Sequence, residues 1–412
     1  MRTALHRKRA IAEALAADAP VGAERERFIE MGAPSRRDEY WRFTDPAKLV
    51  SPLALAQPQT SRIGADAFDA LSPYNIVFAD GVYRPDLSDL AIDGVEITAL
   101  SAGGWFAESV GHLQNRGHSP VMRPLAALNG AVAVEGVAIK VTNTPDRPLR
   151  IHHVGAGEGA GFARVVAHID RGAAVTILEA GAGVARLNGV FEANISDEAT
   201  VHHIRLQTES HGCAATHLFA RLGSEAHLKA FTLSNGAAER LLRNETVVWL
   251  DGENSSAHLA GGVIAKRDGH VDNTVFLTHA AAHCESRQVF KNVVTDKAKA
   301  VFQGKILVEE GAQKTDGYQI SQAILLDERA AFLAKPELEI YADDVVCSHG
   351  STTGALDSDA LFYLKARGLA DDIAKALLVK AFIEDALLEI ERTDLRDLIR
   401  EEAGKLVSEL VS

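Results

Sequence analysis

The fold is decided by a run of short segments in which apolar and polar residues alternate: VAIKVT (137–142), LRIHHV (149–154), ARVVAHI (163–169), AVTILEA (174–180), TVHHIRL (200–206), HLKAFTL (227–233) and ETVVWL (245–250). Alternation of this kind is typical of β-strands, and the Gly, Asn, Asp and Ser residues between the segments favour turns. Between residues 136 and 349, almost no helix-length apolar pattern interrupts the strands. We therefore predict an all-β region of roughly 200 residues, which is long for a simple sandwich.

A loose internal repeat favours a more specific architecture. A small residue followed two positions later by an apolar one recurs at intervals of roughly 26 to 41 residues. The instances are GAAV, EATV, EAHL, SAHL, KAKA and RAAF, whose first alanines are Ala173, Ala199, Ala226, Ala257, Ala298 and Ala330. Repeats of this length suit a parallel β-helix, in which each coil buries its inward residues against the coils above and below. The pattern therefore predicts a parallel β-helix over this region.

Helical patterns precede the β region. An apolar stripe that includes Ile11 runs through the first segment of the chain. Three aromatic residues follow, Tyr40, Trp41 and Phe43, and we expect them to dock the helical region onto the body. Residues 51–128 carry mixed signals, and no fold is assigned to them.

A helical pattern returns after the strands. Asp357 or Ser358 can cap a first helix, and Gly368 stands where a left-handed residue would end it. Two further helices follow, and Thr393 can cap the last one. The predicted divisions are 1–128 for an N-terminal region that is helical at its start, 129–352 for the β-helix core and 353–412 for a C-terminal helical domain.

Composition excludes several classes of protein. A formal net charge of −13 argues against a nucleic-acid partner, because such proteins concentrate Lys and Arg to neutralise phosphates. No run approaches the roughly 18 apolar residues of a membrane span, and Glu13 interrupts a stretch already too short for a secretory signal. Three widely spaced cysteines, Cys213, Cys284 and Cys347, make no disulfide framework, so we expect reduced thiols and a cytoplasmic protein.

Motifs for nucleotide binding and for common enzyme chemistry are missing from the sequence. The segments at 304–305 and 311–315 contain Gly and Lys but lack the Gly-x4-Gly-Lys-[Ser/Thr] arrangement that cradles phosphates. No CxxC, HExxH or GxSxG element occurs either. We therefore expect a protein that is not an enzyme, and any use of ATP must come from a partner.

Cys347 and His349 form the most suggestive pair of side chains. Alternate residues on a strand point to the same face, so a thiolate and an imidazole would lie together there and could hold iron. The alternative interpretation is a buried thiol beside a hydrogen-bonded histidine. The residues themselves leave both interpretations open.

Other clusters are open to simpler interpretations. For one cluster, ligand and packing roles cannot be separated; it contains His279, His283, Cys284, Ser286, Arg287 and Gln288. Each of two histidine doublets is expected to have one member in the core and one at the surface, because adjacent strand residues face opposite ways; they are His152-His153 and His202-His203. Asp343 and Asp344 could serve as paired carboxylates acting on a polysaccharide, although adjacent side chains diverge.

Long stretches of the chain resemble the SufB/SufD family, and its SufD branch in particular. They are HVDNTVFLTHAAAHCESRQVFKNVV (270–294), AVFQGKILVEEGAQKTDGYQ (300–319) and KPELEIYADDVVCSHGSTTGALDSDALFYLKARG (335–368). In addition, RRDEYWRFTD (36–45) resembles the N-terminal element of the family. The resemblance covers most of the last 140 residues, which makes it far more specific than a short motif.

The resemblance implies a mainly β protein, a right-handed parallel β-helix flanked by N-terminal and C-terminal α-helical regions. It also implies a non-catalytic subunit of the SUF iron–sulfur cluster assembly complex, which pairs with SufB along the β-helix and has a role in iron entry. Cys347 and His349 match the SufD positions implicated at the SufB–SufD interface, where iron or a nascent cluster would be held transiently. The SufC ATPase would bind the C-terminal helices, at Leu361, Phe362, Tyr363, Arg367 and Phe382.

Departures from the SufB pattern favour the SufD branch. Gly350 follows His349 where SufB-type chains place a glutamate, and residues 285–346 lack the scaffold cysteine of SufB. We therefore expect no cluster to be bound stably by this chain alone. The alternatives are a self-sufficient scaffold of SufB type and a β-helix carbohydrate-active enzyme that uses Asp343 or Asp344. The sequence leaves open a homodimer in isolation and a contact with a reduced flavin bound by the complex.

Overall fold

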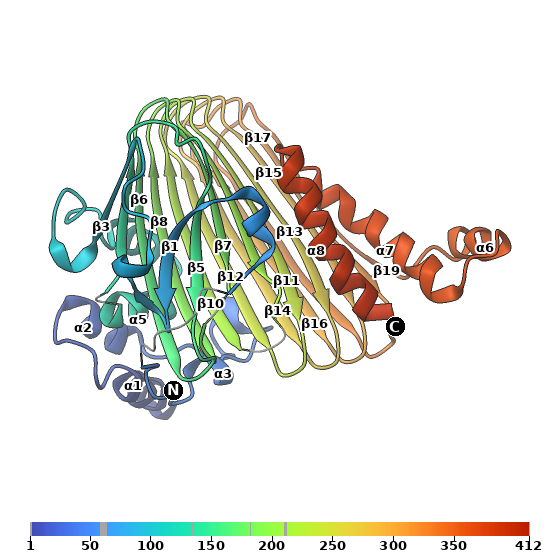
Figure 1. Cartoon of the computed structure of the whole chain (residues 1–412), viewed down its shortest axis with the longest axis horizontal. Helices are drawn as coiled ribbons and strands as arrows, with labels where there is room; N and C mark the ends of the chain where they lie inside the picture. Colours follow the sequence, from blue (N-terminus) through green and yellow to red (C-terminus); the bar gives the residue numbers. More distant parts are fainter. Residues whose placement is uncertain (1, 58–63, 134, 182, 210–211, 412) are drawn as a thin grey trace.

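The body of the protein is a parallel β-helix built from two sheets (Figure 1). The computed structural model describes residues 2–57, 64–133, 135–181, 183–209 and 212–411. From the fourth strand onward, successive strands of the chain enter the two sheets alternately, so each coil in that part of the chain contributes one strand to each sheet. The predicted mainly β architecture, a parallel β-helix with helical regions on either side, is confirmed.

The two sheets differ by one strand. The ten-stranded sheet contains, in spatial order, β19 (Val346–Gly354), β17 (Asp316–Leu325), β15 (Glu285–Val294), β13 (Ser256–Ala265), β11 (His227–Gly236), β9 (Thr200–Gln207), β7 (Ala174–Ala180), β5 (Leu149–Val154), β1 (Tyr74–Ala79) and β2 (Val82–Tyr83). The nine-stranded sheet contains β18 (Ala331–Ile340), β16 (Lys299–Val308), β14 (His270–His279), β12 (Leu241–Leu250), β10 (Cys213–Leu222), β8 (Arg186–Ile195), β6 (Ala160–Ile169), β4 (Val137–Val141) and β3 (Val95–Ala99). Only the β1–β2 and β3–β4 pairs of these sheets are antiparallel.

Each coil takes about 30 residues. His227 follows its ladder partner Thr200 by 27 residues, and Asp316 follows its partner Glu285 by 31. The repeat read from the sequence had wider and less even intervals because it combined two different turns. The buried alanines at 173, 199 and 226 precede strands of the ten-stranded sheet, those at 298 and 330 precede strands of the nine-stranded sheet, and the alanine at 257 lies within β13. The repeat therefore predicted the architecture correctly but assigned the wrong equivalences.

The main core lies between the two sheets. Every second residue of a strand points inward, and these columns are apolar through most of the body; one column contains Val201, Leu228 and Ala257 in register. Full burial of one Leu, Ile or Phe side chain contributes about 1.5–3 kcal/mol. Because the inward side chains of successive coils bury one another, stacking the coils stabilises the fold, whereas a single coil would not be stable by itself.

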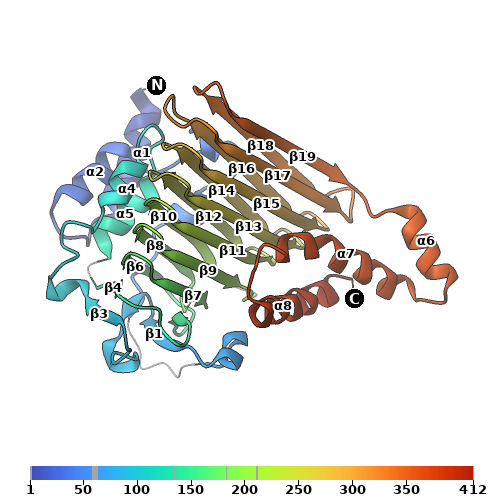
Figure 2. The same ribbon diagram turned by 90° about the horizontal axis from the view of Figure 1, so that it is seen from above.

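Most of the N-terminal helices lie over the outer face of the nine-stranded sheet (Figure 2), whereas the short helices η2 and η3 lie against the ten-stranded sheet. The helical elements before β4 are α1 (Arg2–Leu15), α2 (Ala23–Met31), η1 (Glu39–Trp41), α3 (Ala47–Val50), η2 (Ala67–Leu71), η3 (Pro85–Leu87), η4 (Leu100–Ala102), α4 (His112–Gly117) and α5 (Pro124–Val132). The expected docking by aromatic residues is confirmed for Tyr40 and Trp41, which are both buried. The residues left without an assignment, 51–128, supply β1, β2 and β3 as well as short helices.

The C-terminal region consists of α6 (Ser358–Ala366), α7 (Asp371–Leu387) and α8 (Thr393–Val411). Asp357 caps α6, since its carboxylate accepts hydrogen bonds from the backbone N–H groups of residues 359 and 360, and Gly368 follows with a φ of +88°. Helices α7 and α8 lie on the outer face of the ten-stranded sheet, whereas α6 projects away from the body (Figures 1 and 2). A layer of helices therefore covers each sheet, and one helix stands clear.

Candidate functional site

The β-helix ends on an open coil formed by β18 and β19. Each is the last strand of its sheet and pairs on one side only, β18 with β16 and β19 with β17. All residues of the two strands are half-buried or exposed, unlike the equivalent residues of the inner coils. Within the described chain, no strand pairs with the free edges of β18 and β19. These edges can accept another chain.

Cys347 lies on the inward-facing side of this coil. Its ladder partner is Gly317, and a Cβ atom at that glycine would lie 3.2 Å from the thiol sulfur. The half-buried thiol packs against the apolar cluster that contains Ile306 and Leu338 of the opposite sheet. Burial raises the pKa of Cys347, and the backbone of Gly317 opposes this only in part. The side chain is therefore a neutral thiol at neutral pH.

His349 follows two residues later on the same side of β19. Two residues of a strand span about 6.6 Å, so one metal ion or small cluster could contact both side chains. The imidazole is exposed, and its ladder partner is Gln319, which is fully buried. The structure thus places both predicted residues on one face at the open end of the body.

A column of glutamines continues inward from His349. Gln319 pairs in register with Gln288 on the next coil, and both are fully buried. Among the described residues, no hydrogen-bond partner reaches the side-chain amide nitrogen or oxygen of Gln288 or the amide oxygen of Gln319. Buried amides normally find partners, so the unpaired atoms behind His349 are an unusual polar feature of the core. The sequence showed no sign of it, because strand register alone aligns these residues.

The second cluster is divided between core and surface by the strand alternation. Cys284 is 1% exposed and occupies the turn position that Ala199 and Ala226 hold in earlier coils, and the Nε2 atom of buried His279 lies 2.8 Å from the hydroxyl of Ser286. Arg287 faces outward and pairs with Glu389 at 2.7 Å. The cluster therefore does not form one site.

The interpretation of the histidine doublets was wrong in one respect. His153 and His203 face inward, where both approach the carboxylate of Glu179, at 3.3 and 3.1 Å. The outward-facing members, His152 and His202, are buried as well, at 4% and 8% exposure. The outer face of the ten-stranded sheet is covered here by η2 and by the C-terminal region. The strand alternation therefore predicted correctly which way each histidine side chain points, but not whether it is exposed.

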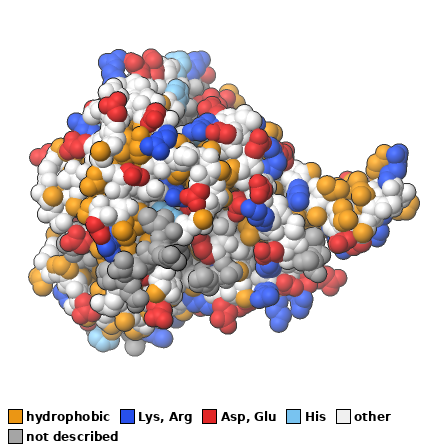
Figure 3. Space-filling view, in the orientation of Figure 1, with side chains coloured by type: hydrophobic (Ala, Val, Ile, Leu, Met, Phe, Trp, Pro, Cys, Tyr) orange, Lys and Arg blue, Asp and Glu red, His pale blue; other side chains and the backbone are white. Residues whose placement is uncertain are grey.

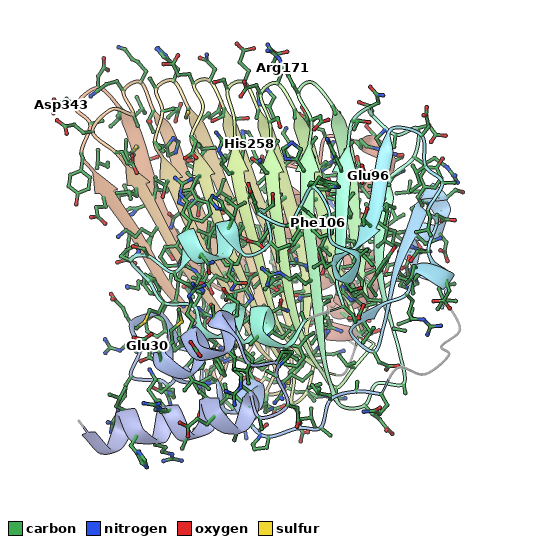
Figure 4. All side chains as sticks on the ribbon, turned by 90° about the vertical axis from the view of Figure 1, so that its left-hand side faces the viewer. Glu30, Glu96, Phe106, Arg171, His258 and Asp343 are labelled. Carbon is green, nitrogen blue, oxygen red and sulfur yellow. The ribbon has the colours of Figure 1, made fainter. Side chains whose placement is uncertain are left out.

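Asp343 and Asp344 lie exposed in the turn that leads into β19. Figure 4 labels Asp343 at the same edge of the body as Arg171, which belongs to the corresponding turn of an earlier coil. Asp344 forms an ion pair with Lys314 of the preceding turn. The carboxylate is thus engaged in joining successive turns.

The residues predicted on the C-terminal helices fall into two groups. Phe362 and Tyr363 are 74% and 57% exposed on the projecting helix α6, where Arg367 stacks on Tyr363 and Leu361 is half-buried. Hydrophobic side chains gather on the part of the chain that projects from the body (Figure 3). Phe382 instead packs against the body, with the ammonium group of Lys291 at 4.7 Å from its ring. Only the α6 group is available to a partner without rearrangement.

The part of the chain that the structure describes has neither a cluster of metal-binding side chains nor a helix that could cross a membrane. No group of three or more His, Cys, Asp or Glu side chains in that part of the chain is arranged to hold a metal ion. None of its helices combines the length and the apolar character needed to cross a bilayer.

The fold and the open coil define a class of protein: a parallel β-helix with helical regions at both ends and a thiol and an imidazole at an unpaired strand edge. Residues 152–382 match the family described as "SUF system FeS cluster assembly, SufBD core domain". The chain therefore belongs to the SufB/SufD family of iron–sulfur cluster assembly proteins, as the sequence resemblance predicted.

Individual relatives are similar over nearly the whole chain. The iron–sulfur cluster assembly protein SufD of Escherichia coli is 29% identical over 401 residues, which cover 92% of this chain and 90% of the relative. A SufBD family protein of Synechocystis is 29% identical and covers 89% and 86% of the two chains. The chloroplastic protein ABCI7 of Arabidopsis thaliana is 27% identical, covering 89% and 81%. The chain is thus SufD-like.

Proposed function

We propose that this chain is the SufD-type partner subunit of a SUF assembly complex, in which it completes the site of cluster formation without catalysing a reaction itself. The observation that carries the proposal is the open terminal coil, which brings Cys347 and His349 to a strand edge. Membership of the cluster assembly family supplies the context.

Pairing with a SufB-type subunit would use the free edges of β18 and β19. Their unpaired backbone groups offer a template along which a second β-helix can continue the sheets. Such pairing would cover the half-buried side chains of the last coil. In isolation, a second copy of this chain could occupy the same edges.

Iron or a nascent cluster is the cargo of the shared site. The neutral thiol of Cys347 must lose its proton to bind iron, so loading would release a proton and become easier as the pH rises. The exposed imidazole of His349 can offer a nitrogen without rearrangement of the strand. A half-buried thiol and one imidazole are too few ligands for a stable site, so the partner subunit would contribute the others. This arrangement would favour transient binding and iron entry.

A SufC-type ATPase would bind the projecting arm, defined here as α6 and the first half of α7. Its exposed apolar residues are Phe362, Tyr363, Ile373 and Leu377. Exposed apolar clusters of this kind mark protein interaction sites. The second half of α7 lies on the ten-stranded sheet, so movement of the arm would reach the body directly. All three cysteines, each in the described chain, are free thiols, which agrees with our proposal of a cytoplasmic complex.

Co-expression with SufB- and SufC-type subunits tests the proposal. We expect a stable complex from the wild type, from Cys347→Ala and from His349→Ala, with cluster yield in either variant reduced about tenfold. Ser348→Ala is the matched control, since Ser348 is exposed and points to the opposite face of the same strand. Failure to co-purify would reject the partner assignment, and normal cluster yield in both variants would reject the role of the two residues.

A further inference from the structure

A cavity of about 240 Å³ lies between the N-terminal layer and the outer face of the nine-stranded sheet. It belongs to the opposite side of the sheet from the core, whereas Cys347 and His349 face inward. The run at 36–45 supplies four of its lining residues, including Tyr40 and Trp41, and β12 supplies Arg243. Met122, which is 60% exposed, also lines the cavity, so the cavity reaches solvent.

Arg243 is held rigidly in this cavity. Its side chain is 2% exposed, its Nη1 atom donates to the carboxylate of Asp272, and its guanidinium carbon lies 4.2 Å from the centre of the Trp41 ring. Thr44 donates to the same carboxylate. Stacking and the ion pair therefore fix the plane and the direction of the guanidinium group.

The remaining edge of that guanidinium group is vacant. Its Nε and Nη2 atoms have no hydrogen-bond partner among the residues that the structure describes. These two N–H groups lie side by side on one edge, in the fork that binds both oxygens of a carboxylate or phosphate. Buried donors that stay unpaired destabilise a protein, so an unpaired fork on a rigid side chain that lines a cavity points to a ligand.

The acidic side chains around the cavity are already matched by other cations. Asp38 pairs with Lys8 at 2.8 Å and Glu245 pairs with Arg123 at 2.9 Å. A third, Glu39, pairs with Lys335 at 2.9 Å. None of these carboxylates is needed to neutralise Arg243, which Asp272 neutralises from outside the cavity. None of these acidic side chains therefore occupies the vacant edge of Arg243.

We propose that this cavity binds a small organic oxyanion, whose carboxylate or phosphate group pairs with the Nε and Nη2 atoms of Arg243 and whose apolar part lies against Trp41 and its neighbours. The volume supports an apolar part, because a cavity of about 150 Å³ accommodates a benzene molecule. Met31, Val121 and Pro124 make part of the lining apolar. The site is independent of the cluster assembly role.

Binding would also join two layers of the molecule. Trp41 comes from the N-terminal region and Arg243 from the β-helix, so one ligand would contact both. A ligand that binds only the docked arrangement stabilises it. Through residues 36–45, the bound ligand would then strengthen the docking of the N-terminal layer on the body.

Calorimetric titration of the full chain tests the proposal with benzoate, phenyl phosphate, inorganic phosphate and the neutral analogue benzamide. We expect saturable binding of benzoate or phenyl phosphate with a Kd below about 1 mM, weaker binding of inorganic phosphate and at least tenfold weaker binding of benzamide. The stronger of the first two identifies the anionic group. Ligand-induced protection of the tryptophan fluorescence from a soluble quencher would support the same binding.

Two variants make the test specific. Arg243→Lys keeps the charge but removes the fork, and we expect it to weaken binding at least tenfold. Met122→Glu leaves Arg243 and the buried ion pairs intact while adding a negative charge at the exposed side of the cavity, so it should weaken anion binding severalfold without affecting folding. Met122→Gln is its neutral control. The proposal is overturned if the wild type binds neither organic anion at about 10 mM, if benzamide binds equally well, or if a folded Met122→Glu protein binds as tightly as Met122→Gln.

Discussion

Helix α7 carries two isoleucines that the fold uses in opposite ways. Ile383 is 1% exposed and packs on the ten-stranded sheet in the same cluster as Phe231 and Val289, whereas Ile373 is 49% exposed on the projecting arm. The same substitution to alanine at the two positions therefore separates docking of the helix from recognition of a partner. The helix supplies its own matched control.

Ile383→Ala should loosen α7 and α8. Truncating a buried Ile costs about 2–5 kcal/mol, which corresponds to roughly 30-fold to several-thousand-fold faster exchange of the amide protons protected by that docking. Hydrogen exchange read by mass spectrometry can localise the change to residues 371–411. Binding of a SufC-type ATPase should change less than about twofold, because the arm itself is intact.

Ile373→Ala should have the reverse effect. A surface substitution changes stability by less than about 0.5 kcal/mol, so exchange in α7 and α8 should match the wild type. Loss of a contact at the centre of an interface costs about 1–2 kcal/mol, or roughly 5- to 30-fold in Kd for the ATPase-type partner. Unchanged exchange in Ile383→Ala would refute the docking of α7, and unchanged affinity in Ile373→Ala would refute the assignment of the arm.

Two further predictions concern the interior. Burial lowers the pKa of His279 from 6.5 to about 4, so the unfolded chain gains this proton first as the pH falls, and the free energy of unfolding decreases between these values by up to about 1.4 kcal/mol per pH unit. Urea unfolding from pH 7 to 4 should therefore show a weaker pH dependence of this free energy for His279→Gln. An unchanged dependence, or the same weakening in the exposed turn variant His283→Asn, would contradict this. Gly317→Val should displace the thiol of Cys347, since even a Cβ atom would lie 3.2 Å from its sulfur. We expect Cys347 to react severalfold faster with a thiol reagent in a Gly317→Val protein of native circular dichroism, and at the wild-type rate in Gly350→Ala. If both variants react like the wild type, Cys347 does not pack against Gly317.

The strand pattern and the helix ends could be predicted because they depend on residues a few positions apart. Alternation marked the strands between residues 136 and 349, and Asp357 with Gly368 marked the limits of α6. The same local pattern misled where a second layer intervened. His152 and His202 point outward as expected but are buried, because η2 and the C-terminal region lie over them.

The candidate site was predicted only in part. Cys347 and His349 were found from the sequence because they are two positions apart on one strand. The glutamines behind them and the vacant fork of Arg243 were not, because they gain meaning only from neighbours on other coils or in the N-terminal layer. Nothing in the residues around Gln288, Gln319 or Arg243 distinguishes them from ordinary strand residues.

By itself, the sequence determined that stacked strands with helical ends would form and that the chain resembles one family, since alternation, caps and long matching segments are properties of contiguous residues. Only the tertiary structure decided which coil stays open, which half of α7 is covered and which polar groups are left without partners in the described chain. The physical reason is that burial and hydrogen bonding are settled between coils and layers. In a β-helix, residues about 30 positions apart become direct neighbours, and segments such as 36–45 and β12 meet across about 200 residues of chain.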